Sequence, residues 1–297
     1  ATWFKGRELG FAFGINLTIA RLGSFSADWM PTWVPSAFEG WRGPLVIAAA
    51  IGSLCVISAL VYGALEARAN RRYGLGEAGE TDKLVLSDLF RFTKSYWFVV
   101  ALCVTFYSAI FPFRGFSIKF FMEAWELTRD TAGQFNSVLP LAAMVATPLF
   151  GLLVDKVGKR ALFMVFGSFL MMPVFLMMAY HVTPLVVPVA MMGIAFSLIP
   201  AVMWPSVAYI VDEKRLGTAY AVMTLVQQIG VMGMPLAIGF LNDRFQASAG
   251  NPAGHIPGMW AFSILGFLAL FFAVMLRREE TGPHAHGLET ITASSKN

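Results

Sequence analysis

The side chain with the clearest capacity for chemistry is Arg21, which lies within an apolar segment covering residues 9–28. It follows Glu8 by 13 residues, which places it about 20 Å along a helix and near the middle of a membrane. An arginine at that depth costs about 2.5–3.5 kcal/mol, so its guanidinium should face a water-filled cavity or a charged partner. Its planar fork suits a carboxylate better than a lysine would. Arg21 therefore either contacts a carboxylate ligand, which is the preferred interpretation, or pairs with an acidic side chain in a structural role.

Six further polar side chains within apolar segments have the chemistry to line the same cavity. Each could equally well form a hydrogen bond between helices, which would contribute under about 1 kcal/mol of stability. Arg114 and Lys119 lie nearer the outer end of their segment, where they either attract anions or, as we expect, reach the lipid headgroups. The six candidate substrate-binding residues are Asn16, Tyr107, Gln134, Asn136, Gln227 and Gln228.

Patterns for catalysis and cofactor binding are missing from the sequence. Cys55 and Cys103 lie inside apolar runs without the spacing of metal ligands, and no nucleophile–base pair or glycine-rich phosphate loop is present. We therefore expect no enzyme, no metal and no cofactor. Acidic residues such as Asp28 and Glu123 stand at the outer ends of segments. A proton relay through these segments would require an acid from elsewhere, and without one any passage of a ligand along them would be facilitative.

These residues are positioned by apolar segments of about 20 residues, the length that spans a bilayer. The chain is 57% hydrophobic and only 13% charged, which indicates an all-α polytopic membrane protein. We predict eight transmembrane helices, at residues 9–28, 43–65, 96–122, 131–154, 161–180, 184–211, 217–241 and 259–276.

Lysine and arginine residues predict which side of the membrane each loop faces. Sixteen of the 22 lie at residues 1–8, 66–95, 155–160, 212–216 and in the tail from 277, and five lie on the opposite side. Because cytoplasmic loops carry the excess of basic residues, these five regions are predicted to be cytoplasmic.

The segment 151–160 combines glycine, aspartate and basic residues at a spacing that suggests more than a charged loop. The first glycine would let a helix approach its neighbour, the aspartate would accept from helix amides or a basic side chain, and the second glycine would permit a tight turn. The pattern resembles the signature loop of the major facilitator superfamily and predicts a conformational-switch loop. Its residues are Gly151, Asp155, Gly158, Lys159 and Arg160.

An internal repeat predicts how the helices are grouped. Residues 9–14 realign on residues 216–221, at an offset of 207. Parallel six-helix repeats of this kind relate the two halves of major facilitator proteins. We therefore predict a fragment of a twelve-helix protein, with helices 9–28 and 43–65 exposing apolar faces. Its regions are the last two helices of the N-terminal bundle (1–65), a cytoplasmic linker with a short interfacial helix (66–95), a six-helix C-terminal bundle (96–280) and a disordered cytoplasmic tail (281–297).

Scattered short motifs resemble the lysosomal dipeptide-transporter branch of this superfamily, over nearly the whole chain. The resemblance implies that the chain corresponds to helices five to twelve and that Arg21 binds the substrate carboxylate. Arg114 departs from the branch, which has an apolar residue there. The motifs lie at residues 3–9, 20–24, 111–113, 119–121, 136–138, 204–208 and 216–220.

We expect an alternating-access transporter of small carboxylate-bearing zwitterions such as dipeptides. The alternatives are a carrier of small organic anions, or a membrane scaffold or accessory subunit that transports nothing. Expected partners are a small-molecule substrate and the lipid bilayer, without nucleic acid; an accessory membrane subunit stays open. The outer loops lack a glycosylation sequon, which favours a prokaryotic cell membrane over a lysosomal one.

Overall fold

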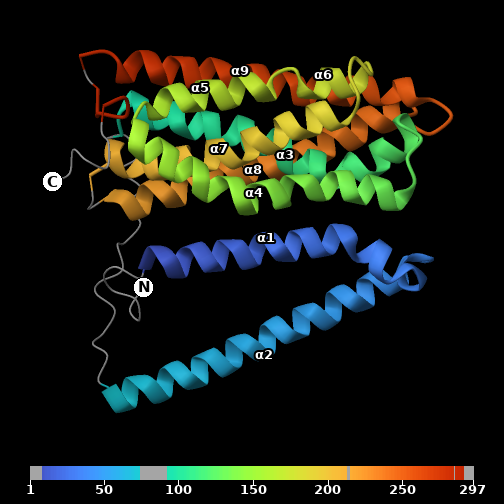
Figure 1. The fold of residues 1–297 in the computed structure, drawn as a ribbon, viewed down its shortest axis with the longest axis horizontal. Helices are drawn as coiled ribbons and strands as arrows, with labels where there is room; N and C mark the ends of the chain where they lie inside the picture. Colours follow the sequence, from blue (N-terminus) through green and yellow to red (C-terminus); the bar gives the residue numbers. More distant parts are fainter. Residues whose placement is uncertain (1–8, 74–91, 213–214, 284, 291–297) are drawn as a thin grey trace.

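The fold is taken from a computed structural model of the chain. It describes residues 9–73, 92–212, 215–283 and 285–290, with side chains described except at residues 9–18, 20, 70 and 73. These residues form long helices without a β-strand, which confirms the all-α membrane fold. Figure 1 shows most of the helices running side by side along one axis, with one N-terminal helix slanting away from the rest.

The C-terminal bundle is built around helix α3 (Lys94–Ala124), which packs against helices on several sides. Its neighbours are α4 (Arg129–Val157), α7 (Val186–Ile210), α8 (Leu216–Arg244) and α9 (Ile256–Glu280). Side chains of α3 and α7 supply much of the buried core. Within a membrane such close packing, and not the removal of apolar surface from water, holds helices together.

One predicted span consists of two helices in the structure. α5 (Arg160–Met171) is followed by α6 (Val174–Ala179), with Pro173 at the junction. Proline lacks the backbone N–H needed to continue the helix, which accounts for the break. The two pieces together form one candidate membrane span, Arg160–Ala179.

Eight predicted spans correspond to observed helices, and seven candidate spans are long and apolar enough to cross a membrane among the described residues. The exception is α1 (Leu9–Trp33), which has the length but contains Arg21 and Asp28. Its 25 residues would extend about 37 Å. Charged side chains in a helix of that length usually face other helices or water rather than lipid.

The first two helices lie beside the C-terminal bundle and differ in how they contact it (Figure 1). α1 packs along α4, and a 3₁₀ turn, η2 (Pro35–Phe38), connects it to α2 (Arg42–Tyr73). No part of the most apolar stretch of α2 is buried, and α1 exposes Ile19, Leu22 and Trp33. These observations confirm the predicted apolar faces.

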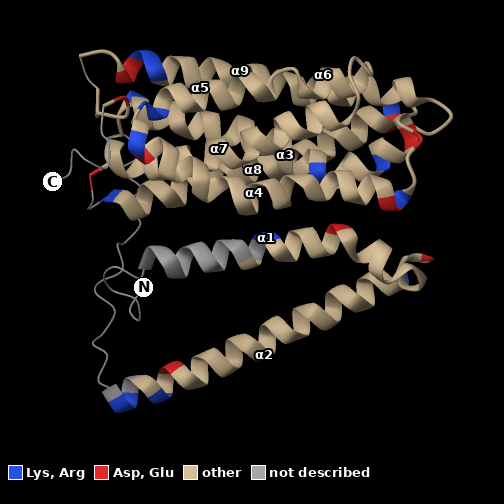
Figure 2. Ribbon diagram, in the orientation of Figure 1, with Lys and Arg blue, Asp and Glu red and all other residues tan. Residues whose placement is uncertain are grey.

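Most charged residues lie toward the two ends of the helices, as the coloured ribbon in Figure 2 shows. The loop at 155–160, the last turns of α2 and the end of α9 lie at the same end, which agrees with the sidedness predicted from the sequence. The predicted linker differs at its start, because residues 66–73 continue α2. The predicted interfacial helix at 84–90 lies outside the described residues.

The prediction of a disordered tail is wrong for the part that the structure describes. Leu288 is fully buried, and the Glu280 carboxylate accepts hydrogen bonds from the backbone N–H groups of His286 (2.9 Å) and Leu288 (3.5 Å). Glu289 accepts from the N–H of Leu162 at the start of α5 (2.9 Å). The polar composition predicted disorder, whereas Glu289 satisfies a free N–H at the start of α5 and the Glu280 side chain at the end of α9 binds the tail backbone.

Candidate functional site

Arg21 projects from α1 toward the C-terminal bundle. Its guanidinium carbon lies 4.6 Å from the centre of the Phe196 ring on α7, a cation–π contact between the two parts of the chain. The side chain is half-buried, within electrostatic reach of Tyr107 and Arg114. No carboxylate pairs with Arg21 among the described residues. The guanidinium is therefore partly desolvated and held by an aromatic ring without an acidic partner.

The ring beneath Arg21 belongs to a wider aromatic surface. Phe111 meets Phe196 edge-on at 5.9 Å and stacks on Tyr107 at 5.2 Å, and all three rings are held by packing between α3 and α7. Offset and edge-on contacts of this kind are the favoured geometries for aromatic side chains. Arg21 thus lies against one ring of an aromatic wall formed by Tyr107, Phe111 and Phe196.

Two further aromatic residues fix the hydroxyl end of Tyr107. The Trp204 indole Nε1–H donates to the Tyr107 hydroxyl (3.0 Å), and the Tyr220 hydroxyl donates to the backbone oxygen of Trp204 (2.9 Å). Trp204 and Tyr220 also stack, with ring centres 5.9 Å apart. The chain of contacts joins α3, α7 and α8, so that the orientation of Tyr107 is fixed by its neighbours.

A second polar cluster lies nearer the outer end of α1. Asp28 accepts from Arg114 Nη2 on α3 (2.8 Å) and from Asn136 Nδ2 on α4 (2.9 Å). Ser117 donates to Asn136 Oδ1 (2.8 Å) and so fixes that amide. The side chains of Arg114 and Asp28 are 16% and 12% exposed. The prediction that Arg114 reaches the lipid headgroups is therefore wrong, because Asp28 gives it a nearby partner.

The loop at 151–160 has a defined geometry in the structure. Gly158 ends α4 with φ 77°, a conformation that glycine adopts without strain, which confirms the predicted turn. Arg160 donates to Asp155, so the aspartate pairs with a basic side chain. Arg160 is itself buried, 4.7 Å from the Tyr209 ring centre, whereas Lys159 is exposed. A Cβ at Gly151 would meet nothing within 4 Å, so the predicted close approach at Gly151 is not found among the described residues.

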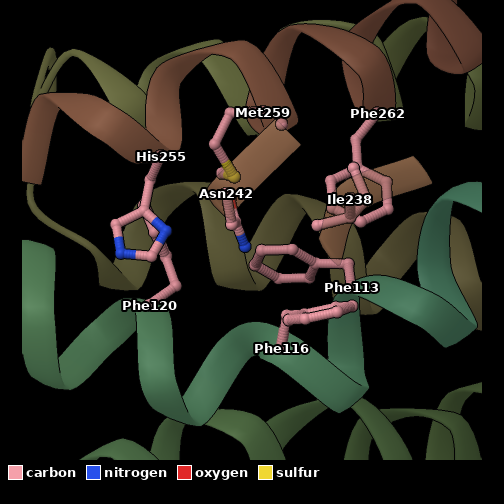
Figure 3. Close-up of a pocket in the computed structure, with 9 residues that line it drawn as sticks. Phe113, Phe116, Phe120, Ile238, Asn242, His255, Met259 and Phe262 are labelled. Carbon is pink, nitrogen blue, oxygen red and sulfur yellow. The ribbon is translucent and has the colours of Figure 1, made fainter. Parts of the chain in front are cut away.

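A small pocket elsewhere in the bundle is shown in Figure 3. It lies between α3, α8 and α9, with mostly aromatic and aliphatic side chains around it. The buried His255 at its edge contacts Glu123 (Nε2 to Oε2, 2.9 Å). None of the residues around Arg21 lines this pocket, so it is not the candidate site.

The match to a known family can now be set beside this geometry. Residues 113–294, more than half of the chain, match the sequence profile described as Major Facilitator Superfamily. The chain belongs to the major facilitator superfamily. The predicted origin of the loop at 151–160 is thereby confirmed, and the expectation that the chain is not an enzyme agrees with a family of transporters.

Curated relatives within the superfamily carry the name Lysosomal dipeptide transporter MFSD1. The protein of Danio rerio is 36% identical over 81% of this chain and 54% of its own length. Those of Homo sapiens and Gallus gallus are 33% and 32% identical, each over 82% of this chain and over 54% and 57% of their own lengths. These matches confirm the resemblance to the dipeptide-transporter branch. The chain spans about half the length of these curated relatives.

Within this superfamily fold, the predicted site residues separate into groups. Tyr107 lies with Arg21, whereas Asn136 belongs to the Asp28 cluster. Gln227 is half-buried, and its Oε1 accepts from Cys103 Sγ (3.4 Å), one helical turn from Tyr107. Two glutamines, Gln134 and Gln228, are exposed, and the side chain of Asn16 is not described.

Sequence reasoning missed the aromatic wall and the Asp28 partner. Phe111, Phe196 and Trp204 lie in apolar runs, where an aromatic residue that packs against a polar or charged side chain has the same sequence signal as one facing lipid. Asp28 was placed at a helix end, where acids are common. The available signal was spacing: Asp28 follows Arg21 by seven residues, which puts both on one face of a helix.

Proposed function

We propose that this chain forms part of an alternating-access membrane transporter for small carboxylate-bearing zwitterions such as dipeptides. One observation carries the proposal. Arg21 presents a partly buried guanidinium on α1, where α1 meets the aromatic wall of α3 and α7, and no described acid pairs with it. In alternating access, α1 and the C-terminal bundle would move apart. A cation at the contact between them is suited to a ligand that binds α1 and the bundle at the same time.

The chemistry of the guanidinium supports a carboxylate as the ligand group. Its contact with the Phe196 ring stabilises the cation without supplying a hydrogen-bond acceptor. The N–H donors of Arg21 therefore still need an acceptor, and a carboxylate fits two of them in parallel. Desolvation beside the aromatic wall strengthens such a pair relative to one in water.

The ammonium group of a zwitterion requires an acidic or strongly polar partner. Asp28 is the acid nearest along α1, but both of its oxygens already accept hydrogen bonds. The partner of the ammonium group is therefore expected in the part of the relatives that this chain does not match. A carrier of simple organic anions, the alternative, would need no such group.

Binding measurements on the full-length protein test the role of Arg21. Arg21→Lys keeps the charge and loses the fork, and Arg21→Gln removes both. We expect Arg21→Gln to weaken binding of a dipeptide by roughly 30-fold or more, with Arg21→Lys between it and the wild type. Arg42→Gln is the matched control, because Arg42 is exposed at the start of α2.

The substrate supplies a second control. Amidating the C-terminus of the dipeptide should weaken binding to the wild type far more than to Arg21→Gln, because the two changes remove the same contact. N-acetylation removes the ammonium charge and should also weaken binding; unchanged affinity would favour the organic-anion alternative. If the ratio of affinities for free and amidated dipeptide is the same in all variants, Arg21 does not bind the carboxylate.

The chain is a multi-pass membrane protein. The expectation of a prokaryotic cell membrane rested on a missing glycosylation sequon. The vertebrate relatives are named as lysosomal, which gives that expectation no support and counts against it.

A further inference from the structure

The outer half of α1 is joined to two helices of the C-terminal bundle by one carboxylate. Asp28 Oδ2 accepts from Arg114 on α3, and Asp28 Oδ1 accepts from Asn136 on α4. Ser117 holds the Asn136 amide in the orientation that presents its N–H₂ group to Asp28. Both oxygens of the carboxylate are therefore used in bonds across the boundary between α1 and the bundle.

Neighbouring contacts show that the helices approach closely at this point. Trp29 Nε1 donates to Ser137 Oγ on α4 (2.8 Å). A Cβ at Gly133 of α4 would lie 2.8 Å from the backbone oxygen of Asp28, so this position has no room for a side chain. Beyond α1, the Arg129 guanidinium lies 5.4 Å from the Phe38 ring centre in η2. The boundary is therefore closed at its outer end by directional contacts.

The contacts at this boundary stabilise the closed arrangement only weakly, so the boundary is able to open. Arg114 and Asp28 lose most of their hydration in the closed arrangement, and Arg114 Nε is buried without a hydrogen-bond partner. An ion pair of this kind gains attraction but gives up solvation, so its net stabilisation is small. Water entering an opened boundary would hydrate all of these groups, which keeps the open and closed arrangements close in free energy.

The cluster is also connected to the candidate site by its position. Asp28 and Arg21 are two turns apart on the same face of α1, about 10 Å along the axis. Arg21 and Arg114 are within electrostatic reach and repel each other. In the closed arrangement Asp28 neutralises Arg114. When the boundary opens, Asp28 and Arg21 stay together on α1, whereas Arg114 on α3 loses its acidic partner and faces the opened space as a cation that would attract a carboxylate.

We propose that Asp28 and Arg114 form an outer latch, which closes the outer end of the boundary between α1 and the C-terminal bundle and opens during each transport cycle. The proposal rests on the proposed function, since it assigns the latch to the outward-closed state. Arg114 and Asp28 are positioning residues here, because they set the arrangement of helices and not the contact with substrate.

The test measures distances across the boundary in the full-length protein in lipid nanodiscs, without substrate. Spin labels are placed at Ser36→Cys in η2 and Asp130→Cys in α4, which are both exposed. The exposed Cys55 is replaced by Ser, and the buried Cys103 is kept. Pulsed electron–electron double resonance then gives the populations of the short and long distances between the two labels.

We expect Asp28→Asn and Arg114→Gln each to shift the ratio of closed to open populations by about tenfold toward the open state. The charge swap, Asp28→Arg with Arg114→Asp, should restore much of the closed population, because the Asn136 amide can rotate to present its oxygen. Gly133→Ala acts by steric contact alone and should also favour the open state. Lys119→Gln is the control and should change nothing, since Lys119 is exposed and its nearest acid, Glu123, lies on its own helix.

Two results would overturn the latch. One is unchanged label distances in both Asp28→Asn and Arg114→Gln. The other is a charge swap that restores none of the closed population although both single variants favour the open state. If a charge variant does not fold, Gly133→Ala decides, and unchanged distances in that variant overturn the proposal. The measurement needs no ligand, so loss of the proposed substrate leaves the latch standing, and loss of the latch leaves the Arg21 binding test intact.

Discussion

Replacing Glu280 by Ala should release the C-terminal tail from the bundle. Glu280 ends α9 and is 2% exposed, yet its two oxygens accept four hydrogen bonds. Oε1 faces the Ser95 hydroxyl (2.6 Å) and His286 Nδ1 (2.8 Å). Oε2 faces the backbone N–H groups of His286 (2.9 Å) and Leu288 (3.5 Å). One carboxylate thus joins the start of α3 and the end of α9 to the tail.

The loss of local stability in a Glu280 variant depends on which of its hydrogen-bond partners can still be satisfied. Hydrogen bonds to a charged group contribute about 1.5–3 kcal/mol each. Glu280→Ala leaves two backbone N–H groups without an acceptor, so the tail should lose about 3 kcal/mol of local stability. Glu280→Gln should lose only about 1 kcal/mol, because its amide N–H₂ can face Ser95 and His286, which are both able to accept.

Hydrogen exchange of the peptide covering residues 281–290 measures this local stability. A loss of about 3 kcal/mol corresponds to exchange that is roughly 100-fold faster for the His286 and Leu288 amides, with a smaller increase for Glu280→Gln. Glu279→Ala is the matched control, since Glu279 is half-exposed on the same turn. Equal exchange in wild type and Glu280→Ala would refute the role assigned to this carboxylate.

Two further predictions concern the loop at 151–160. Gly158→Ala should lower the free energy of unfolding by about 1 kcal/mol, because φ is 77° at this residue. Gly151→Ala should leave that free energy unchanged or slightly raise it, because a Cβ there meets nothing within 4 Å in a helix. Thermal unfolding in detergent compares the two variants. Asp155→Asn removes the carboxylate that pairs with the buried Arg160 and should slow exchange between inward- and outward-open states more than it weakens substrate binding. Single-molecule fluorescence measures that exchange, and a loss of affinity with unchanged exchange rates would contradict this assignment.

The helices were predictable because bilayer thickness leaves little freedom in their length. Apolar runs of about 20 residues gave the spans, and the basic loops between them gave the prediction, still untested, of which loops are cytoplasmic. The break at Pro173 was not predicted, since prolines at other positions, such as Pro112 and Pro140, are accommodated within helices. Neighbouring side chains and carbonyl groups decide that outcome, and the sequence pattern does not contain them.

The site was predictable where a residue is costly and not where it is common. Arg21 is expensive in a membrane, so its presence alone indicated a cavity or a partner. Tyr107 was named as a candidate because it is polar, but Phe196, which contacts Arg21, has no distinguishing signal within an apolar run. Arg114 was misplaced because its partner Asp28 is 86 residues away in the chain, and only the fold brings them together.

The central claim is that Arg21 serves the transport of a carboxylate-bearing zwitterion, and uptake into liposomes tests it most directly. Full-length protein is reconstituted, and entry of labelled dipeptides with apolar, cationic and anionic side chains is followed over time. The account predicts saturable uptake of at least one class, accelerated by unlabelled dipeptide inside the liposomes and reduced roughly 30-fold or more in Arg21→Gln at substrate concentrations below saturation. Uptake no faster than in empty liposomes for every class, or equal uptake by wild type and Arg21→Gln, would contradict it.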